Sequence, residues 1–402
     1  MSKECKAPSA RRIEVLYAFV QGSYQAAYCV FSGYTAVYLA YKGLTDSQIS
    51  ITSSLVGIVA VVIQLLLASY CDAHLSVPLK RVISCLNVVS IIAVTLLQFI
   101  PLPIAFLIIL FIITKASCDS IGVFLNSNIV QFVNSGVNVN YGWPRGIGSI
   151  TYAVAALVMG WLSERYHGEI LVYCFMALSL LSLVFILIFP KPNISVNKKE
   201  KKVRMPSYLS IVRHNPTLIF FLLAIILIFM GSIPSGLFLI RFVQSAGGTE
   251  AELGTCLFIK AGVEFPALFA AGWLRKKFSF RQLTVVAQSS SLLQPAILLA
   301  SLFIKQMWII YAAMVMAIIP SGLGLYAFVG YVNEIAADGE RVRIQSLVGF
   351  AQMLGVVIGG AYAGSLLDCF GLEIMTLVSI GIIAIGVSCS IISYNLHKKV
   401  FP

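Results

Sequence analysis

The sequence has few charged residues for its length. Only 11% of the 402 residues are Asp, Glu, Lys or Arg, whereas 59% are hydrophobic. Soluble globular proteins carry about 25% charged and about 45–50% apolar residues, so a soluble core could not contain this apolar surplus. The shortage of charge therefore excludes an ordinary soluble protein and indicates one whose surface faces lipid.

Metal-binding and disulfide patterns are also missing. The nine cysteines form no Cys-x-x-Cys motif and no recurring spacing, and most of them lie inside apolar runs. This distribution is typical of buried free thiols that behave as small apolar residues. We therefore expect no disulfide framework, no metal and no cofactor.

The sequence contains no signature of an enzyme or of a nucleic-acid-binding protein. No nucleophile–base pair, metal-spaced set or phosphate-binding loop occurs, so we expect no enzymatic activity. Basic residues outnumber acidic ones by 28 to 16, but they form short clusters between apolar runs, as the positive-inside rule describes. Nucleic acid is not an expected partner. The start, MSKECKAPSARR, has no cleavage site, so the first apolar segment is expected to stay in the membrane.

Long apolar runs make up most of the chain. A helix needs about 20 predominantly apolar residues to span a bilayer. Runs of this kind predict an all-α integral membrane protein with twelve transmembrane helices. Their approximate ranges are 13–40, 48–70, 82–100, 103–126, 146–163, 170–190, 217–240, 253–273, 283–304, 307–332, 345–367 and 372–394.

The basic residues predict the orientation and the division of the chain. With both termini in the cytoplasm, 22 of the 28 Lys and Arg lie in cytoplasmic segments and four lie outside, which is the expected bias. The polar, basic stretch 191–216 is interpreted as a cytoplasmic linker between two six-helix bundles, 1–190 and 217–402. We expect a multi-pass protein of the cytoplasmic (inner) membrane, surrounded by lipids and monomeric.

The two halves contain similar turns. YLAYKGLTDSQIS at 38–50 resembles FVQSAGGTEAELG at 242–254, an offset of 204 residues. Each stretch leaves an apolar helix, turns at Gly43 or Gly247, and enters the next helix through a threonine and an acidic residue, which suit a helix start. Two parallel repeats of six spans are typical of carriers that rock around a site near the middle of the membrane.

Four charged residues lie inside predicted spans. Lys115 and Asp119 are four residues apart in one span, and Lys260 and Glu264 are four residues apart in another, so each pair shares a helix face. Charges inside the bilayer are costly and mark functional sites by default. These four residues are therefore candidates for proton coupling. The alternative is that each pair only neutralises itself so that its helix can insert.

The first span carries a polar stripe. Gln21, Tyr24, Gln25 and Tyr28 follow the i, i+3, i+4, i+7 spacing of one helix face. Such a face must meet another helix or a watery cavity. Hydrogen bonding between helices is one interpretation, and binding of a hydroxylated or heterocyclic solute is the other.

Several stretches of the sequence resemble motifs of one family. ASYCDAHLSVPLKR keeps Asp72 and the basic pair Lys80–Arg81 of a G-x-L-x-D-R-x-G-R-R motif, and GWLRKKFSFRQ keeps Gly272 and the basic run in the second half. YGWPRGIGSITY keeps Arg145 of a Y-G-x-x-R-x-x-G-S-I-G segment. Through these stretches the chain resembles the major facilitator superfamily, and within it the lactose-permease-like and nucleoside- or phenylpropionate-permease-like proton symporters.

The resemblance implies roles for particular residues. It implies that Arg145 binds the substrate; the alternative is that Arg145 is an ordinary basic anchor. Tyr152, two turns further along the helix, could offer its ring for stacking. Glu264 lies in a segment that matches the subgroup's E-I-P motif. Asn126 lies where members often have an acidic residue, so a sugar preference does not carry over. Asp72, Lys80, Arg81 and Gly272 would have gating roles.

One motif of the subgroup is missing. The tenth span, AIIPSGLGLY, has no histidine, and all four histidines lie outside the predicted spans. The sequence therefore predicts proton-coupled symport of a small polar solute, namely a sugar, a nucleoside or a small organic acid, without a histidine relay. Export of amphiphilic compounds is the first alternative, and a non-transporting membrane sensor is the second.

Overall fold

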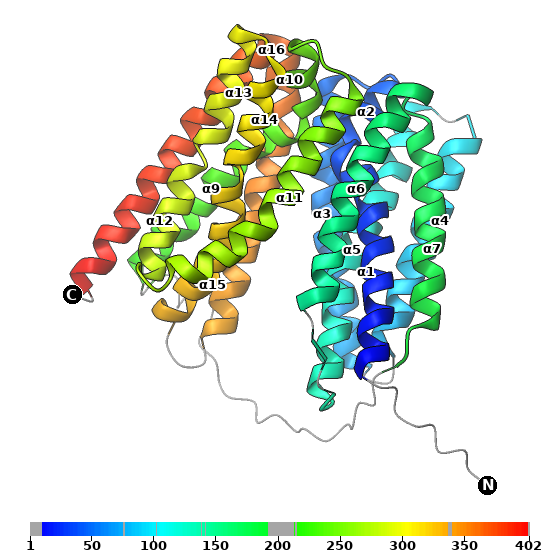
Figure 1. Cartoon of the computed structure of the whole chain (residues 1–402), viewed down its shortest axis with the longest axis horizontal. Helices are drawn as coiled ribbons and strands as arrows, with labels where there is room; N and C mark the ends of the chain where they lie inside the picture. Colours follow the sequence, from blue (N-terminus) through cyan, green and yellow to red (C-terminus); the bar gives the residue numbers. More distant parts are fainter. Residues whose placement is uncertain are drawn as a thin grey trace. The chain divides into compact units, whose positions relative to one another are not determined.

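The computed structural model describes residues 10–74, 77–101, 103–137, 139–140, 142–191, 213, 215–336 and 340–400. These residues form helices joined by short turns, and they contain no strand (Figure 1). The all-α prediction is therefore confirmed for the described part. Most of the predicted linker, 191–216, lies outside it.

Packing contacts divide the chain into two compact units. Unit 1 comprises Met1–Thr35 and Leu55–Lys199, and unit 2 comprises Ala36–Ser54 and Glu200–Pro402. The units largely follow the two halves of the sequence, but segment Ala36–Ser54 of the first half packs with the second. The helix that starts at Asp46 consequently begins in unit 2 and ends in unit 1.

Unit 1 is a bundle of long apolar helices. Its helices are α1 (Ala10–Gly33), most of α3 (Asp46–Ala73), α4 (Leu79–Phe99), α5 (Ile104–Asn134), α6 (Gly142–Tyr166) and α7 (Ile170–Ile188). Pro78 and Pro103 stand directly before α4 and α5, where the missing N–H of proline costs little and its φ suits a helix start. In the core, the ring of Phe31 lies 5.2 Å from that of Phe111 and 4.6 Å from that of Phe175. This contact joins α1 to α5 and α7.

Unit 2 contains more interrupted helices. They are α2 (Thr35–Tyr41), α9 (Pro216–Leu237), α10 (Leu239–Ser245), α11 (Glu250–Leu274), α12 (Phe280–Ser290), α13 (Leu293–Ile304), α14 (Met307–Met316), the π-helical turn η1 (Ile319–Leu323), α15 (Gly324–Ile335) and α16 (Arg341–Val400). α9 packs along α16, and Gly355 permits the contact because an added Cβ there would lie 2.5 Å from the carbonyl oxygen of Ile226. Gly371, at φ 79° and ψ 176°, divides α16 into two helical stretches.

A proline explains one of these interruptions. Pro320 lies in η1, between α14 and α15. Because proline lacks an N–H and its ring clashes with the preceding turn, it disfavours a regular α-helix, and a π turn accommodates it locally. The hydroxyl of Ser321 donates to the carbonyl oxygen of Ala317 at 2.8 Å. The predicted tenth span is therefore one helical stretch with a π-helical turn inside it.

The two similar turns have the same local structure. Gly43 and Gly247 both have positive φ, 85° and 83°, a conformation that glycine adopts without steric cost. The following helix begins with a capping box in the first turn and with a related threonine cap in the second. Thr45 exchanges hydrogen bonds with Gln48, and Thr249 donates from its N–H and its hydroxyl to the Glu252 carboxylate at 2.7 and 2.5 Å. The predicted repeat of the turn is confirmed.

Many of the helices are compatible with membrane insertion. Among the described residues, nine helical stretches are long and apolar enough to cross a bilayer. Large apolar side chains such as Leu65, Leu66 and Phe303 are exposed on them, as expected for lipid-facing surfaces. The number of twelve spans and the cytoplasmic location of both termini stay predictions.

Candidate substrate site

An ion pair lies inside unit 1. Lys115 and Asp119 occupy successive turns of α5, and the Lys115 ammonium group pairs with the Asp119 carboxylate. The side chains are 10% and 24% exposed, respectively. The predicted shared face is therefore confirmed, and the carboxylate is the more accessible partner of the two.

A cluster of three tyrosine rings lies next to this ion pair. The Nζ atom of Lys115 lies 4.9 Å from the ring centroid of Tyr28, within the range of a cation–π contact. The ring of Tyr28 in turn lies 5.9 Å from that of Tyr24 and 6.3 Å from that of Tyr152. The structure thus brings together residues that the sequence identified separately on α1, α5 and α6.

Hydrogen bonds hold the tyrosines in place. The Tyr24 hydroxyl donates to the carbonyl oxygen of Cys118 at 3.2 Å. The hydroxyls of Tyr152 and Ser32 lie 3.2 Å apart. The polar face of α1 is therefore hydrogen-bonded to α5 and α6. This agrees with the interpretation of the polar stripe as a face that meets other helices.

The two glutamines of the stripe pack on a glycine. An added Cβ at Gly148 would lie 2.8 Å from Cγ of Gln21 and 3.1 Å from Cγ of Gln25, so this glycine permits the close approach of α1 and α6. Gln21 is 2% exposed, and its Oε1 has no hydrogen-bond partner within the described part of the chain. A buried acceptor without a donor is costly, and a solute hydroxyl or amine would satisfy it.

Two other predicted substrate residues lie nearer the ends of their helices. Arg145 is half-buried in the first turn of α6. Asn126 is exposed on α5, and its Oδ1 lies 3.4 Å from the Tyr17 hydroxyl. Asn128 on the same helix is buried, and neither polar atom of its side chain has a partner among the described residues.

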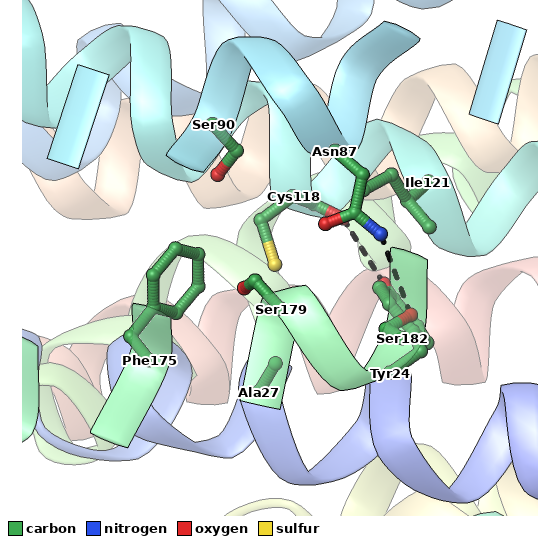
Figure 2. A pocket seen from close by; sticks show the side chains of 9 residues that line it. All are labelled: Tyr24, Ala27, Asn87, Ser90, Cys118, Ile121, Phe175, Ser179 and Ser182. Atoms are coloured by element: carbon green, nitrogen blue, oxygen red, sulfur yellow. Dashed lines mark hydrogen bonds between the residues drawn. The ribbon is translucent and has the colours of Figure 1, made fainter. Parts of the chain in front are cut away.

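A small polar pocket lies next to Tyr24 (Figure 2). The pocket is far smaller than the about 300–1,000 Å³ of typical ligand pockets. Figure 2 shows Asn87 and Ser90 of α4 facing Ser179 and Ser182 of α7 across it. The Asn87 amide donates to the Ser182 hydroxyl at 3.4 Å. Sequence reasoning missed these four residues, although the two members of each pair are three residues apart on an apolar helix, the spacing of a shared polar face.

The second charged pair lies on α11 in unit 2. Lys260 is exposed there, in contrast to the buried Lys115. The side chain of Glu264 lies outside the described residues. The proton-coupling role assigned to these two residues from the sequence stays a prediction.

The predicted gating residues lie at helix ends. Asp72 and Arg81 are exposed, and Gly272 is exposed with nothing within 4 Å of an added Cβ. Lys80 instead donates from Nζ to the carbonyl oxygens of Leu187 and Phe189, at 3.2 and 2.8 Å. It thereby satisfies free carbonyl groups at the end of α7.

A family model matches nearly the whole sequence. The MFS_1 like family covers residues 12–378. The chain belongs to this family. Members of this kind are transporters of the major facilitator superfamily, so the chain is a multi-pass membrane transporter and not an enzyme. The described residues contain no group of three or more His, Cys, Asp or Glu side chains that could hold a metal ion.

Individual relatives are distant. The chain is 26% identical over 207 residues to the maltose permease of Geobacillus stearothermophilus, a match covering 52% of this chain and 50% of that protein. The chain spans about half the length of the curated relatives it matches. The crystal structure of the nucleoside transporter NupG resembles it with a TM-score of 0.78 at 15% identity, covering 95% and 99% of the chains. The crystal structure of the D-xylose–proton symporter resembles this chain with a TM-score of 0.68 at 12% identity, and the match covers 95% of this chain and 96% of that chain.

Proposed function

We propose that this transporter is a proton-coupled symporter of a small polar organic solute, working by alternating access. Sugars, nucleosides and small organic acids are the candidate solutes. The observation that supports this proposal is the Lys115–Asp119 pair beneath the ring of Tyr28. α5 has the length and composition of a membrane span. An ionisable pair is costly to place in such a helix, and it is therefore a candidate for a functional site.

The pair suggests how a proton would be coupled to the solute. Asp119 is more exposed than Lys115, so an arriving proton reaches the carboxylate first. Protonation of Asp119 releases the ammonium group of Lys115, which then binds a hydroxyl or carboxylate of the solute. When the proton leaves, the ion pair re-forms and expels the solute.

The neighbouring side chains suit a polar solute with a ring. The rings of Tyr28 and Tyr152 offer apolar faces, and the Gln21 carbonyl oxygen offers an acceptor. Tyr24, Gln25, Arg145 and Asn126 would supply further hydrogen bonds. Lys260 and Glu264 would form a second proton site in the other half, and Asp72, Lys80, Arg81 and Gly272 would control opening.

The relatives agree with this class of solute. The similar proteins are a maltose permease, a nucleoside transporter and a D-xylose–proton symporter. We therefore expect a monomeric solute carrier of the cytoplasmic membrane with a hydroxylated or heterocyclic solute.

Uptake into vesicles tests the proposal. The purified chain is reconstituted, and maltose, xylose and uridine are tested with and without an inward proton gradient. We expect the gradient to drive uptake of one of them. Asp119→Asn and Glu264→Gln should each abolish the gradient dependence, whereas Glu164→Gln, at an exposed position on α6, should not change it. Gradient-driven uptake that persists in both variants would contradict the assigned roles, and gradient-driven efflux would indicate an exporter.

A further inference from the structure

A pocket in unit 2 is separate from the candidate substrate site. It lies between α12 and the last turns of α16, with Phe221 of α9 and Tyr331 of α15 also in its lining. The pocket is far smaller than the about 300–1,000 Å³ of typical ligand pockets, so a whole organic solute does not fit. Its polar lining includes Arg281, Thr284, Gln288, Ser390, Ser393 and Tyr394.

The pocket contains buried polar groups without hydrogen-bond partners. Thr284 is 2% and Gln288 is 1% exposed. Within the described residues, Thr284 Oγ1, Gln288 Nε2 and Arg281 Nε are buried and have no partner. The Gln288 side-chain oxygen accepts from the Ser390 hydroxyl, so the amide nitrogen is the atom of this side chain that lacks a hydrogen-bond partner. The three residues share one face of α12 at i, i+3 and i+7, and together they present three donor groups without a hydrogen-bond partner among the described residues.

The charge around the pocket is positive. The Arg281 guanidinium lies 4.4 Å from the ring centroid of Tyr394. The nearby Glu334 carboxylate lies 3.7 Å from the Arg275 guanidinium and also interacts electrostatically with Arg281. Two cations thus share one anion. Exposed Lys276 and Lys277 follow in the loop before α12 and add to the positive charge.

The corresponding place in unit 1 shows what is missing. Lys80 lies just before the third predicted span of the first half, 82–100, as Arg281 lies just before the third of the second half, 283–304. Lys80 donates to the carbonyl oxygens of Leu187 and Phe189 at the end of α7. α16 continues past Tyr394 to Val400, so its backbone carbonyls there are used within the helix. Arg281 has the position of Lys80 without the acceptors of Lys80.

We propose that this pocket binds a phosphate-type oxyanion, and that the anion is the headgroup phosphate of an anionic phospholipid. A guanidinium fork binds phosphate oxygens in a bidentate manner, and the Thr284 hydroxyl and the Gln288 amide would donate to the same anion. The pocket lies at the end of unit 2 that carries the basic loop 275–277, which the charge distribution predicts to be cytoplasmic. Basic pockets between helices on that side of a membrane suit anionic headgroups.

Thermal unfolding of the purified full-length chain in detergent tests the proposal. The midpoint is measured with phosphatidylglycerol, phosphatidylcholine or inorganic phosphate, because a ligand that binds the folded state raises it. We expect phosphatidylglycerol to raise the midpoint and phosphatidylcholine to leave it unchanged. Arg281→Gln should lose the response. Lys276→Gln, which removes the same charge from the exposed loop, should retain it.

The outcomes separate the alternatives. An equal loss of the response in both variants would show diffuse attraction to anionic lipid and overturn the proposal, as would an equal response to both lipids. A rise with inorganic phosphate as large as with phosphatidylglycerol, lost in Arg281→Gln, would support the oxyanion site and overturn the headgroup as its source.

A second variant covers the case in which Arg281→Gln does not fold. Thr284→Val keeps the shape of the side chain and removes its hydroxyl. We expect a lipid-free midpoint equal to or above that of the unmodified chain, because a buried unsatisfied hydroxyl is lost, together with a weaker response to phosphatidylglycerol. A full response in this variant would overturn the role of Thr284 as a donor to the anion.

Discussion

Asp46 at the start of α3 forms an ion pair with Arg241 of α10, with 2.7 Å between Oδ1 and Nη2. Ser47, the next residue, donates from its backbone N–H and its hydroxyl to the Asp368 carboxylate of α16, at 2.8 and 2.5 Å. All four residues belong to unit 2, although α3 continues into unit 1. These contacts fasten the first turn of α3 to two helices from the other half of the sequence.

Arg241→Gln tests the strength of this ion pair. The side chains of Asp46 and Arg241 are 13% and 38% exposed, so we expect a loss of stability of about 0.5–1 kcal/mol. High salt should shrink the loss, because exposed charges are screened. Thermal unfolding at low and high salt measures it, with Asp46→Asn/Arg241→Gln closing a double-mutant cycle. An identical loss at both salt concentrations would contradict an electrostatic origin.

Gly364→Ala tests the close packing of α3 on α16. A Cβ at Gly364 would collide with the carbonyl oxygen of Asp46 and with Ser50, whose hydroxyl accepts from the Gly364 N–H at 2.8 Å. We expect a loss of about 1–3 kcal/mol from overpacking. Gly349→Ala on the same helix has nothing within 4 Å of the added Cβ and serves as the control. Equal midpoints for the two variants in thermal unfolding would show that the contact tolerates a methyl group.

Replacement of one member of the Lys115–Asp119 pair should destabilise the protein more than replacement of both. Asp119→Asn leaves a buried ammonium group without its anion. Loss of one partner of a fully buried pair costs about 3–5 kcal/mol, and we expect about 1–3 kcal/mol here because the Asp119 side chain is 24% exposed. Lys115→Met/Asp119→Asn should recover most of this loss in thermal unfolding. A double variant no more stable than Asp119→Asn alone would argue against charge as the cause.

Lys80 and Arg81 are neighbours with different expected effects. Lys80→Met removes two hydrogen bonds to the end of α7, and we expect a loss of about 1–2 kcal/mol, since such bonds from a charged donor are worth about 1.5–3 kcal/mol before solvent screening. Arg81→Met, at an exposed position, should change stability by less than about 0.5 kcal/mol. Thermal unfolding compares the two variants, and a larger effect of Arg81→Met would contradict the capping role of Lys80.

Much of the fold could be predicted from the sequence. A membrane span must satisfy its own backbone hydrogen bonds, so a long apolar run predicts a helix whatever its neighbours are. The turns at Gly43 and Gly247 were predictable for a similar reason, because glycine, threonine and an acidic residue are local signals. The Lys115–Asp119 pair belongs to the same class, since i, i+4 spacing places both residues on one helix face.

The exceptions arose where distant residues compete with local signals. Segment Ala36–Ser54 belongs by sequence to the first half, yet its serines and Asp46 bind α10 and α16. The contact of Lys80 with the carbonyl oxygens at the end of α7 was not predicted either, and the gating role that its motif implies stays a prediction. Neither contact has a signal in the spacing of residues along one helix.

The sequence by itself determined the helical class, the family, the polar face of α1 and the charged pair of α5, because periodicity and hydropathy are properties of single segments. Only the tertiary structure decided which of these faces meet. Tyr28 lies next to Lys115, Asn87 faces Ser182, and Arg281 lines a pocket with unpartnered donors, because each helix has a particular rotation and tilt. These are set by packing against several neighbours at once, which no single segment encodes.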